Sequence, residues 1–415
     1  MLFFYNILVH LTGFALRGIA LFSKKIELFV VGRNHVFDDL KNAFKQEDSV
    51  IWFHAASLGE FEQGRPVIEK LKSIYPKHKL LLTFFSPSGY EIRKNYDVAD
   101  KVVYLPLDTR KNAQKFVEMV RPDMAVFIKY EFWPNFLREL KKQHTHTILI
   151  SGIFRKEQSF FKWYGAWMKA SLETFHHFFV QDIPSRELLS SIGFNNVTIS
   201  GDTRFDRVFE ITRQDIKLPY LDNFKNHKRT LVAGSTWPKD EELLVNFINT
   251  HSNEGQKFII VPHNIHKESI QQLKKNILKP TILFSEKEGK TLEKYQVFIV
   301  DTIGLLSKIY KYADMAYVGG GFGSGIHNIL EPATFGVPIL IGPEYKRFKE
   351  AVEMITLGAC FTVKDNKSFN NIAQKLLNDD AYRVSCGSIS KEYVIKNIGA
   401  TKLIITYITG IISKK

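Results

Sequence analysis

Short apolar runs alternate with amphipathic stretches along the chain from residue 50 to residue 180. After Glu60, for example, Val67, Leu71 and Ile74 recur at the spacing of one helix face, with charged residues between them. Strands that alternate with helices in this way pair in parallel. We therefore expect a parallel sheet with strands at residues 50–54, 80–84, 102–104, 124–128, 147–150 and 178–180.

A second series of apolar runs follows a polar break at residues 208–227, which mixes charges and contains Pro219. Its strands are expected at residues 230–233, 258–261, 297–300, 315–318 and 338–341. Two such series predict an α/β protein with two Rossmann-like domains and a ligand cleft between them, where the strands end. The expected parts are an amino-terminal segment (1–22), a first domain (23–207), a linker (208–227), a second domain (228–395) and a carboxyl-terminal segment that packs back on the body (396–415).

The first 22 residues are almost entirely apolar, with one charge at Arg17. This is nearly the length of a membrane span, and Lys24 and Lys25 follow directly. The pattern favours a spanning or interfacial helix with the main body on the cytoplasmic side. A buried helix of a soluble domain fits the same length.

Composition narrows the function classes. Lysine and arginine exceed aspartate and glutamate by 57 to 43, a net charge of +14 that attracts phosphates on nucleic acid, lipid or nucleotide. The length of 415 residues and the 45% hydrophobic content exclude a small stapled scaffold and a disordered chain. Only Cys360 and Cys386 are present, so neither a disulfide framework nor a cysteine zinc site is expected, and a reducing compartment is favoured.

The first candidate site is a strand that runs into a carboxylate. Residues 53–60 read FHAASLGE, which places Glu60 in the first turn of the following helix. A carboxylate there can act as general base for a hydroxyl nucleophile. Alternatively, Glu60 complements the helix dipole, and Ser57 forms a capping box with it. No Gly-x-Ser-x-Gly is present, which disfavours a serine hydrolase.

The second candidate site follows the strand at residues 124–128. Lys129, Glu131 and Trp133 combine a cation, an anion and an aromatic ring, a set suited to a sugar acid. The alternative is a structural ion pair between Lys129 and Glu131 beside a half-buried Trp133.

The third candidate site has five glycines within residues 319–325, after a strand. Glycines let the backbone approach a ligand closely, and the amides of the following helix could receive a phosphate. Glu331, in that helix, could accept hydrogen bonds from ribose hydroxyls. The segment is neither a P-loop nor a dinucleotide fingerprint. A purely structural glycine turn is the alternative.

Three more strands end in candidate ligand contacts: residues 234–237, which include Ser235, then Pro262 and His263, and then residues 301–305. His263 and His266, with the distant His327, could suggest a metal, but no third ligand is set by the spacing. We predict no metal site.

Taken together, these segments resemble the 3-deoxy-D-manno-octulosonic acid (Kdo) transferases of lipid A assembly, which are glycosyltransferases of the GT-B architecture with two Rossmann-like domains. The resemblance spans about residues 20 to 360. It rests on HAASLGE (54–60) with GRP (64–66), TFFSPSGY (83–90), YLPLD (104–108), KYEFWPN (129–135), GDTRFDR (201–207), GSTW (234–237), DTIG (301–304) and residues 319–332.

The resemblance implies an inverting transfer of Kdo from CMP-Kdo to a phosphorylated lipid A precursor, lipid IVA, without a metal or other cofactor. The first domain would bind the acceptor and the second CMP-Kdo. Glu60 matches the family's proton acceptor. The family's CMP-contacting positions fall on Pro262, His263, Ile303, Gly304, Leu305, Asn328, Ile329, Leu330 and Glu331. Further substrate contacts are expected, on loop position, from Ser57, Lys129, Glu131, Arg204, Ser235 and Gly320.

One departure from the family pattern concerns the donor. Many members have Pro-Arg-His where this chain has Pro262-His263-Asn264, so an arginine contact to the donor phosphate is missing or supplied from elsewhere.

The lipid acceptor, the apolar amino terminus and the basic surplus together predict an enzyme on the cytoplasmic face of the inner membrane. A sugar-nucleotide epimerase of the same architecture is the alternative enzyme, but it would need no membrane segment. A nucleic-acid-binding protein is disfavoured, because the basic residues are scattered and form no recognisable module.

Overall fold

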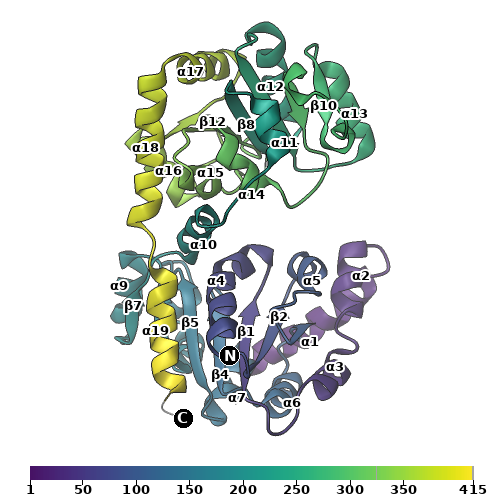
Figure 1. Ribbon diagram of the computed structural model, residues 1–415. Coiled ribbons are helices and arrows are strands. Elements are labelled where there is room, and N and C mark those ends of the chain that lie inside the picture. Colours follow the sequence, from purple (N-terminus) through teal and green to yellow (C-terminus); the bar gives the residue numbers. More distant parts are fainter. Residues whose placement is uncertain (324, 414–415) are drawn as a thin grey trace. The chain divides into compact units, whose positions relative to one another are not determined.

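A computed structural model describes residues 1–323 and 325–413 and divides the chain into two compact units. The first unit comprises Met1–Asp206 and the chain from Ile398 onward, and the second comprises Arg207–Asn397 (Figure 1). Each unit has its own parallel sheet, which confirms the predicted pair of Rossmann-like α/β domains.

In the described residues of the first unit, a seven-stranded parallel sheet has the order β3-β2-β1-β4-β5-β6-β7. Residues alternate between its two faces, as a doubly covered sheet requires. Ile51 and Phe53 pack in the cluster under α4 and α19, whereas Val50 and Trp52 pack in the cluster under α3, α6 and α7. The strands are β1 (Val50–Ala55), β2 (Lys79–Phe84), β3 (Lys101–Tyr104), β4 (Met124–Ile128), β5 (His146–Gly152), β6 (Phe175–Val180) and β7 (Val197–Ile199).

Helices cover both faces of this sheet (Figure 1). They are α1 (Leu2–Ile19), α2 (Lys24–Val31), α3 (Val36–Ala43), α4 (Leu58–Ile74), α5 (Pro87–Arg93), α6 (Arg110–Val120), α7 (Pro134–Lys142), the 3-10 helix η1 (Ser159–Phe161), α8 (Ala166–Leu172), α9 (Ile183–Ser191) and α19 (Ala400–Ile412).

The second unit repeats the plan, with a seven-stranded parallel sheet of order β10-β11-β9-β8-β12-β13-β14 in its described residues. Helices α12, α13 and α17 bury their apolar faces against it. The strands are β8 (Arg229–Thr236), β9 (Gln256–Pro262), β10 (Thr281–Leu283), β11 (Val297–Ile299), β12 (Met315–Val318), β13 (Ile339–Ile341) and β14 (Cys360–Thr362).

The helices of the second unit include several of three to five residues. They are α11 (Pro219–Lys225), α12 (Pro238–Thr250), α13 (Lys267–Asn276), η2 (Phe284–Glu286), η3 (Leu292–Lys294), α14 (Leu306–Ile309), η4 (Tyr310–Tyr312), α15 (Leu330–Thr334), α16 (Lys349–Leu357), α17 (Asn366–Asn378) and α18 (Asp380–Lys396).

Three strands lie outside the sequence prediction: β7, β10 and β14. Each has three residues and lies at the edge of its sheet. An edge strand has one neighbour and needs only a short pairing segment, so its hydrophobic pattern is weak.

The predicted linker at residues 208–227 is wrong. These residues belong to the second unit, and they contain the end of α10 (Thr203–Thr212) and all of α11. Pro219 opens α11, a position where proline is well tolerated, while Leu221 and Phe224 are fully buried. The apolar pair three residues apart was the signal that the charged composition concealed.

The carboxyl-terminal segment was expected to pack back on the body, and α19 contacts α4 in the first unit. It buries Ile404, Ile405 and Ile408 in the core. The Asp206 carboxylate accepts hydrogen bonds from the amides of Gly399 (2.7 Å) and Thr401 (3.0 Å) at the start of this helix. The segment is therefore part of the first domain rather than a separate tail.

Helix α1 exposes its large apolar side chains: Phe3, Phe4, Leu8, Leu11 and Phe14 are 62% to 78% exposed. In the described chain, α1 and the stretch Asp380–Ile412 are the helical segments long and apolar enough to cross a bilayer. The polar side of α1 is fastened to the domain. The Tyr5 hydroxyl donates to Asp108 (2.7 Å), and the Asn135 amide donates to Asn6 (2.9 Å).

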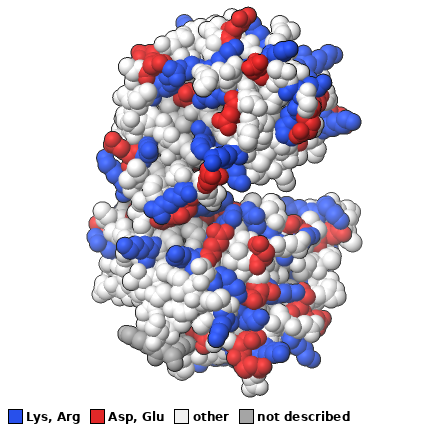
Figure 2. All heavy atoms as spheres, in the orientation of Figure 1, with Lys and Arg blue, Asp and Glu red and all other residues white. Residues whose placement is uncertain are grey.

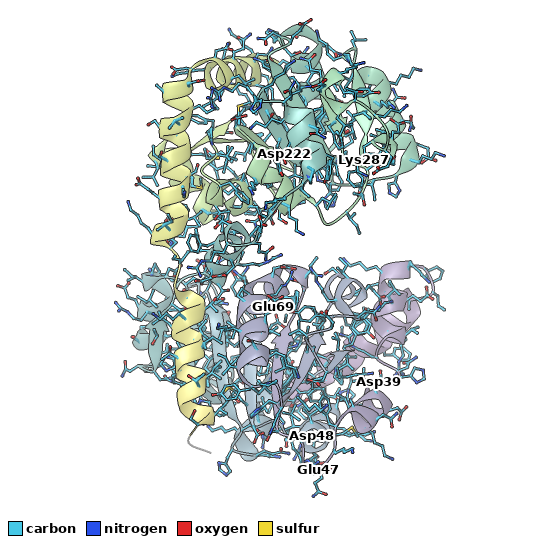
Figure 3. All side chains as sticks on the ribbon, in the orientation of Figure 1. Asp39, Glu47, Asp48, Glu69, Asp222 and Lys287 are labelled. Atoms are coloured by element: carbon cyan, nitrogen blue, oxygen red, sulfur yellow. The ribbon has the colours of Figure 1, made fainter. Side chains whose placement is uncertain are left out.

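Charged side chains of both signs are interspersed over the face drawn in Figure 2. Several form surface ion pairs, including Lys101–Asp39 (2.9 Å) and Arg65–Glu69 (2.7 Å), whose acidic members are labelled in Figure 3. Exposed pairs of this kind contribute at most about 1 kcal/mol each to stability. The interspersed pattern on this face agrees with the scattered basic residues expected from the sequence.

Candidate active site

The first two candidate motifs meet at one edge of the first sheet. Strands β1 and β4 are neighbours and run parallel, so their carboxyl ends lie side by side. Glu60 follows β1, and Lys129 and Glu131 follow β4. The fold therefore brings together residues about 70 positions apart in the sequence, as expected for the functional end of a parallel sheet.

Glu60 lies in the first turn of α4, and its side chain is half-buried. The Ser57 hydroxyl donates to Glu60 Oε2 over 2.6 Å. The alternative of a capping box is not complete, because the Ser57 side chain makes no hydrogen bond to the helix backbone. Burial raises the pKa of the Glu60 carboxyl and the charge of Glu131 raises it further, against lowering contributions from Ser57 and Lys129. A carboxylate with increased proton affinity and partial exposure is suited to accept a proton from a bound hydroxyl.

Glu131 is held by a buried polar network that includes His54 and Thr83, which were not predicted as site residues. Its Oε2 atom accepts a hydrogen bond from Trp133 Nε1 (2.8 Å) and lies 3.0 Å from His54 Nε2. His54 Nδ1 lies 2.8 Å from the Thr83 hydroxyl, which also accepts from Trp52 Nε1 at 2.8 Å. The sequence does contain a signal for His54. It is a polar residue within an otherwise apolar strand, and it lies on the same strand face as Trp52.

The network also explains the orientation of the second motif. Trp133 is half-buried, as the structural alternative supposed, but its indole nitrogen donates a hydrogen bond to Glu131.

The Lys129 ammonium lies 5.0 Å from the centre of the Tyr130 ring. Burial raises the pKa of the Tyr130 hydroxyl, and the charges of Glu60 and Arg204 also act on it. Lys129, Tyr130 and Arg204 therefore belong to the same electrostatic environment as Glu60.

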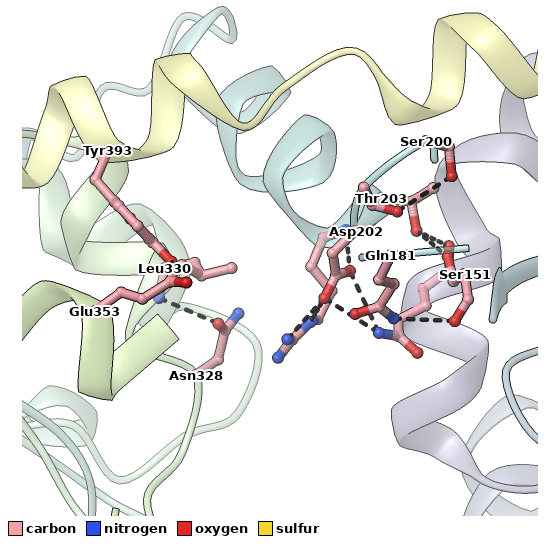
Figure 4. Close-up of polar contacts among 12 residues, drawn as sticks. Ser151, Gln181, Ser200, Asp202, Thr203, Asn328, Leu330, Glu353 and Tyr393 are labelled. Carbon is pink, nitrogen blue, oxygen red and sulfur yellow. Dashed lines mark hydrogen bonds and ion pairs between the residues drawn. The ribbon is translucent and has the colours of Figure 1, made fainter. Parts of the chain in front are cut away.

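Arg204 is oriented by the residue two positions before it. The Asp202 carboxylate accepts from the Arg204 backbone amide (2.9 Å) and from Arg204 Nε (2.8 Å). Gln63 Nε2 also donates to Asp202, and Thr203 hydrogen-bonds the Gln63 carbonyl and the Ser151 hydroxyl (Figure 4). The GDTRFDR segment is thereby tied to α4, the helix that carries Glu60.

In the second unit, four neighbouring strands supply the predicted ligand contacts. The sheet order β11-β9-β8-β12 brings together Ser235, near the end of β8, and the loops that contain Ile303–Leu305, His263 and Gly320. Pro262 is buried, whereas His263, Ile303 and Gly304 are exposed and Ser235 and Leu305 are half-buried. The edge of this sheet thus presents short loops with few charges.

The glycine-rich segment packs closely on its own domain. A β-carbon on Gly319 would overlap the Ser235 carbonyl, and one on Gly321 would come within 2.6 Å of Gly342. The Gly320 amide donates to Asp240 Oδ2 (2.9 Å), so this amide is already bonded within the protein. Asp240 was not predicted, and it also accepts from the Tyr317 hydroxyl (2.5 Å). Close packing within the domain therefore explains why several of these positions are glycine.

An aromatic stack stands beside this segment. The rings of Trp237 and His263 are 4.4 Å apart and nearly parallel, and His327 lies 4.8 Å from His263. Burial lowers the pKa of both histidines, so both imidazoles are neutral near pH 7. A cavity of about 340 Å³ adjoins the stack, lined by Trp237, Pro238, Lys239, Asp240, Gly320, Phe322 and Gly323. Among the described residues, no group of three His, Cys, Asp or Glu side chains could hold a metal.

The helix expected directly after the glycines starts later and is shorter. Helix α15 begins at Leu330 and has five residues, so Asn328 and Ile329 lie in a loop. Asn328 Oδ1 accepts the Leu330 amide (3.2 Å; Figure 4), and its Nδ2 donates to Glu331 (3.2 Å). The side chains of Ile329 and Leu330 are fully buried, so only their backbone can contact a ligand. Burial raises the pKa of Glu331, opposed by Arg207.

Comparison with known proteins identifies the family. The family model described as 3-deoxy-D-manno-octulosonic-acid transferase (kdotransferase) matches residues 33–207. A 3-deoxy-D-manno-octulosonic acid transferase of Chlamydia trachomatis serovar A is 30% identical over 312 residues, which cover 72% of this chain and 71% of the relative. The chain belongs to the Kdo transferase family. An enzyme of the same description from Rickettsia typhi is 26% identical and covers 80% of this chain and 72% of the relative.

This Kdo transferase is thus a glycosyltransferase of lipopolysaccharide biosynthesis. Its family model covers the segments that carry Glu60, Lys129, Glu131 and Arg204. Family membership decides between the two enzyme classes that share the architecture, and it disfavours the epimerase alternative.

Solved structures support the fold of the Kdo transferase. A putative UDP-N-acetylglucosamine 2-epimerase from Listeria monocytogenes superposes with a TM-score of 0.59 at 10% identity, covering 89% of this chain and 98% of that one. The UDP-GlcNAc 2-epimerase of Neisseria meningitidis, solved with UDP-GlcNAc, gives 0.59 at 14% identity, covering 87% and 100%. These likenesses concern the GT-B fold of two Rossmann-like domains.

Proposed function

We propose that this enzyme transfers Kdo from CMP-Kdo to a phosphorylated lipid A precursor, lipid IVA, with inversion at the anomeric carbon and with Glu60 as general base. The observation that carries the proposal is the environment of Glu60. Its carboxyl is half-buried, hydrogen-bonded by Ser57 and close enough to Glu131 for that charge to raise its pKa. The identity of the transferred sugar, Kdo, is inferred from membership of the Kdo transferase family.

In the proposed reaction, an acceptor hydroxyl attacks the anomeric carbon of Kdo. Its proton passes to Glu60, the new carbon–oxygen bond forms, and the bond from the anomeric carbon to the phosphate oxygen breaks with its electron pair on CMP. A single displacement of this kind inverts the configuration. The increased proton affinity of Glu60 favours the proton transfer.

The donor site is proposed in the second unit. The exposed faces of Trp237 and His263 offer rings on which a cytosine base can stack. Asn328 and Glu331, already joined by a hydrogen bond, carry polar atoms for ribose hydroxyls. Pro262, Ile303, Gly304, Leu305, Ile329 and Leu330 would complete the site, with Ile329 and Leu330 contributing backbone atoms. Ser235 and Gly320 adjoin the same segment, and the proposed reaction uses no metal or other cofactor.

The acceptor is proposed to bind the first unit, with Ser57, Lys129, Glu131 and Arg204 near its reacting sugar. We also propose that α1 holds this unit to the cytoplasmic face of the inner membrane as an interfacial helix. Its polar residues Tyr5 and Asn6 are bonded to the domain, while its phenylalanine and leucine side chains remain exposed. A helix fastened along its polar side presents its apolar side to lipid.

The test is transfer from CMP-Kdo to lipid IVA, measured by mass spectrometry of the lipid for the unaltered protein, Glu60→Gln and a control, Glu69→Gln, on the outer part of α4. We expect product with the unaltered protein and the control and almost none with Glu60→Gln. Absence of product from unaltered protein that still binds CMP would show the acceptor to be wrong. Absence of CMP binding would refute the donor.

A further inference from the structure

The glycine-rich segment (residues 319–323 and 325) is enclosed by the loop between β13 and α16, residues 342–348. Backbone atoms of Gly321 and Gly342 pack so closely that a β-carbon on either residue would come within 2.6 Å of the other. The Glu344 amide donates to the Gly321 carbonyl over 2.9 Å. These contacts hold the β13–α16 loop against the segment whose glycines the sequence predicts to lie close to a ligand.

Arg347, in this loop, lies directly on the glycine-rich segment. Its Nη2 atom occupies the space that a β-carbon on Gly325 would need, and Gly325 has a φ of +118°, which favours glycine. The guanidinium is exposed and lies 5.1 Å from the centre of the Phe348 ring. Within the described part of the chain it has no hydrogen bond or ion pair, whereas the nearby Lys349 is 3.7 Å from Glu353.

Lys239 is the cation that lines the cavity beside Gly320 and Gly323, but a lysine ammonium is a point charge without a planar set of donors. The two histidines near the segment do not supply a positive charge. Burial lowers the pKa of His263 and of His327, which leaves both neutral near pH 7. Burial lowers the pKa of Arg207, and the charge of Glu331 acts on it. An exposed arginine, by contrast, stays charged and presents a planar set of donors that fits two phosphate oxygens at once.

We propose that Arg347 binds the phosphate of the donor nucleotide against the glycine-rich segment. It would thereby supply the cationic contact that the chain lacks at Pro262-His263-Asn264. This assignment rests on the proposed function, because it takes the glycine-rich segment to hold the phosphate of CMP-Kdo.

The chemistry gives Arg347 a role beyond binding. The phosphodiester of CMP-Kdo carries one negative charge, and cleavage of its bond to Kdo leaves a second charge on the departing CMP. A cation fixed beside the phosphate therefore stabilises the leaving group more than the bound donor. Removing it should weaken CMP binding and also slow transfer.

The experiment measures calorimetric binding of CMP and of cytidine, which lacks the phosphate, to unaltered full-length protein, Arg347→Ala and Arg347→Lys. Lys346→Ala is the matched control, since it removes the neighbouring exposed charge from the same loop. We expect Arg347→Ala to weaken CMP binding by about tenfold or more, in line with the loss of a charged hydrogen-bonding pair, and Arg347→Lys to weaken it less. Cytidine binding should stay the same in every variant.

Three results would overturn the assignment: unchanged CMP binding by Arg347→Ala, an equal loss of cytidine binding, or an equal loss of CMP binding with Lys346→Ala. The last would mean that only the total charge of the loop matters. If the unaltered protein binds no CMP, the proposed donor is wrong and this assignment falls with it. Arg347 is exposed, so the folded state of its variants, checked by circular dichroism, should match that of the unaltered protein.

Discussion

Different kinds of side chain lie at the carboxyl ends of the strands in the two sheets. At the edge of the first sheet, ionisable side chains lie close together: Glu60, Glu131, His54 and Lys129 are joined by hydrogen bonds or by their charges. At the edge of the second sheet, glycines, neutral imidazoles and an indole lie around the buried carboxylate of Asp240. The difference is in line with the proposed roles, in which the first domain accepts a proton and the second binds the nucleotide.

The same contrast appears in how each edge is supported. In the first unit, Thr83 and His54 hold the carboxylate of Glu131, whose charge acts on Glu60. In the second, Asp240 bonds Tyr317, Gly320 and Trp237, and so fixes the shape of a loop. A buried polar network can therefore orient a reacting group or shape a backbone, and variants should separate these two uses.

The largest expected effect comes from Glu60→Gln. Loss of a general base reduces the rate of such a step by about 10² to 10⁴-fold, so kcat should fall in that range while the Kd for CMP stays unchanged. Steady-state transfer assays with calorimetric CMP binding check both quantities. A parallel loss of CMP affinity would contradict the division of roles between the two edges. Glu69→Gln should leave both quantities unchanged.

Asp240→Ala should affect the second edge only. It leaves the Tyr317 hydroxyl and the Gly320 amide without their acceptor, at a cost of about 1–3 kcal/mol in the free energy of unfolding. Because the glycine-rich segment loses its anchor, CMP affinity should also fall, which calorimetry and urea unfolding can measure together. Glu242→Ala, at an exposed position two residues later, is the control. Unaltered CMP affinity in a destabilised Asp240→Ala would separate the loop from the donor.

Thr83→Val tests the network of the first edge with little change of shape. It leaves Trp52 Nε1 and His54 Nδ1 without the hydroxyl, and we expect a loss of about 1–3 kcal/mol in unfolding free energy. Transfer should slow because Glu131 is less well held, while CMP binding remains. Thr198→Val is the matched control. Thr198 lies on the edge strand β7 and is only partly buried, and its hydroxyl is 2.9 Å from Nε2 of His177. An equal loss of unfolding free energy and of transfer rate in both variants would show that the Thr83 network has no particular role in transfer.

The pKa of Glu60 offers a smaller and more specific effect. Burial and the Glu131 charge favour the protonated form, so the Glu60 carboxyl should titrate above the ordinary range of glutamate. The base is active when ionised, so kcat/KM should fall as pH decreases through that raised pKa. In Glu131→Gln one raising charge is gone, and the titration followed by carboxyl ¹³C NMR should move to lower pH. A shift in the opposite direction would exclude the coupling.

Raised proton affinity also has a consequence for stability. A carboxyl whose pKa is higher in the folded than in the unfolded protein binds its proton more tightly when folded. Its contribution to stability is therefore greatest below the unfolded pKa and declines as pH rises through the folded pKa. Glu60→Gln should remove this decline.

The smallest expected effect is that of metal removal. The proposed mechanism uses charged and polar protein groups at both edges, so treatment with EDTA should leave the rate of transfer unchanged. Transfer assays before and after EDTA, with Mg²⁺ added back in a third arm, check this. A loss that Mg²⁺ restores would add a metal to the second edge.

Much of the fold followed from patterns in the sequence. The central strands of both sheets are long apolar runs whose burial on two faces leaves a strong signal, as in residues 50–54 and 124–128. The edge strands β7, β10 and β14 and the helix α11 lacked such a signal, because a short or charged segment needs few apolar contacts to stay in place.

Single side chains of the candidate site were predictable where they follow a strand. Glu60 and the glycines are examples, since the ends of parallel strands are where such folds bind ligands. His54, Thr83 and Asp240 were not predicted as site residues. Each acts through a partner that is distant in the sequence, such as Thr83 for His54 or Gly320 for Asp240.

The sequence by itself determined the two parallel domains, the family resemblance and the position of the candidate base, because periodicity and local motifs are encoded over a few neighbouring residues. Only the tertiary structure decided that Ser57 bonds Glu60 rather than the helix backbone, that Glu131 belongs to a buried network and that Arg347 lies on Gly325. Hydrogen-bond partners and close approaches depend on which strands become neighbours. That choice is made by packing of the whole sheet, which local spacing does not contain.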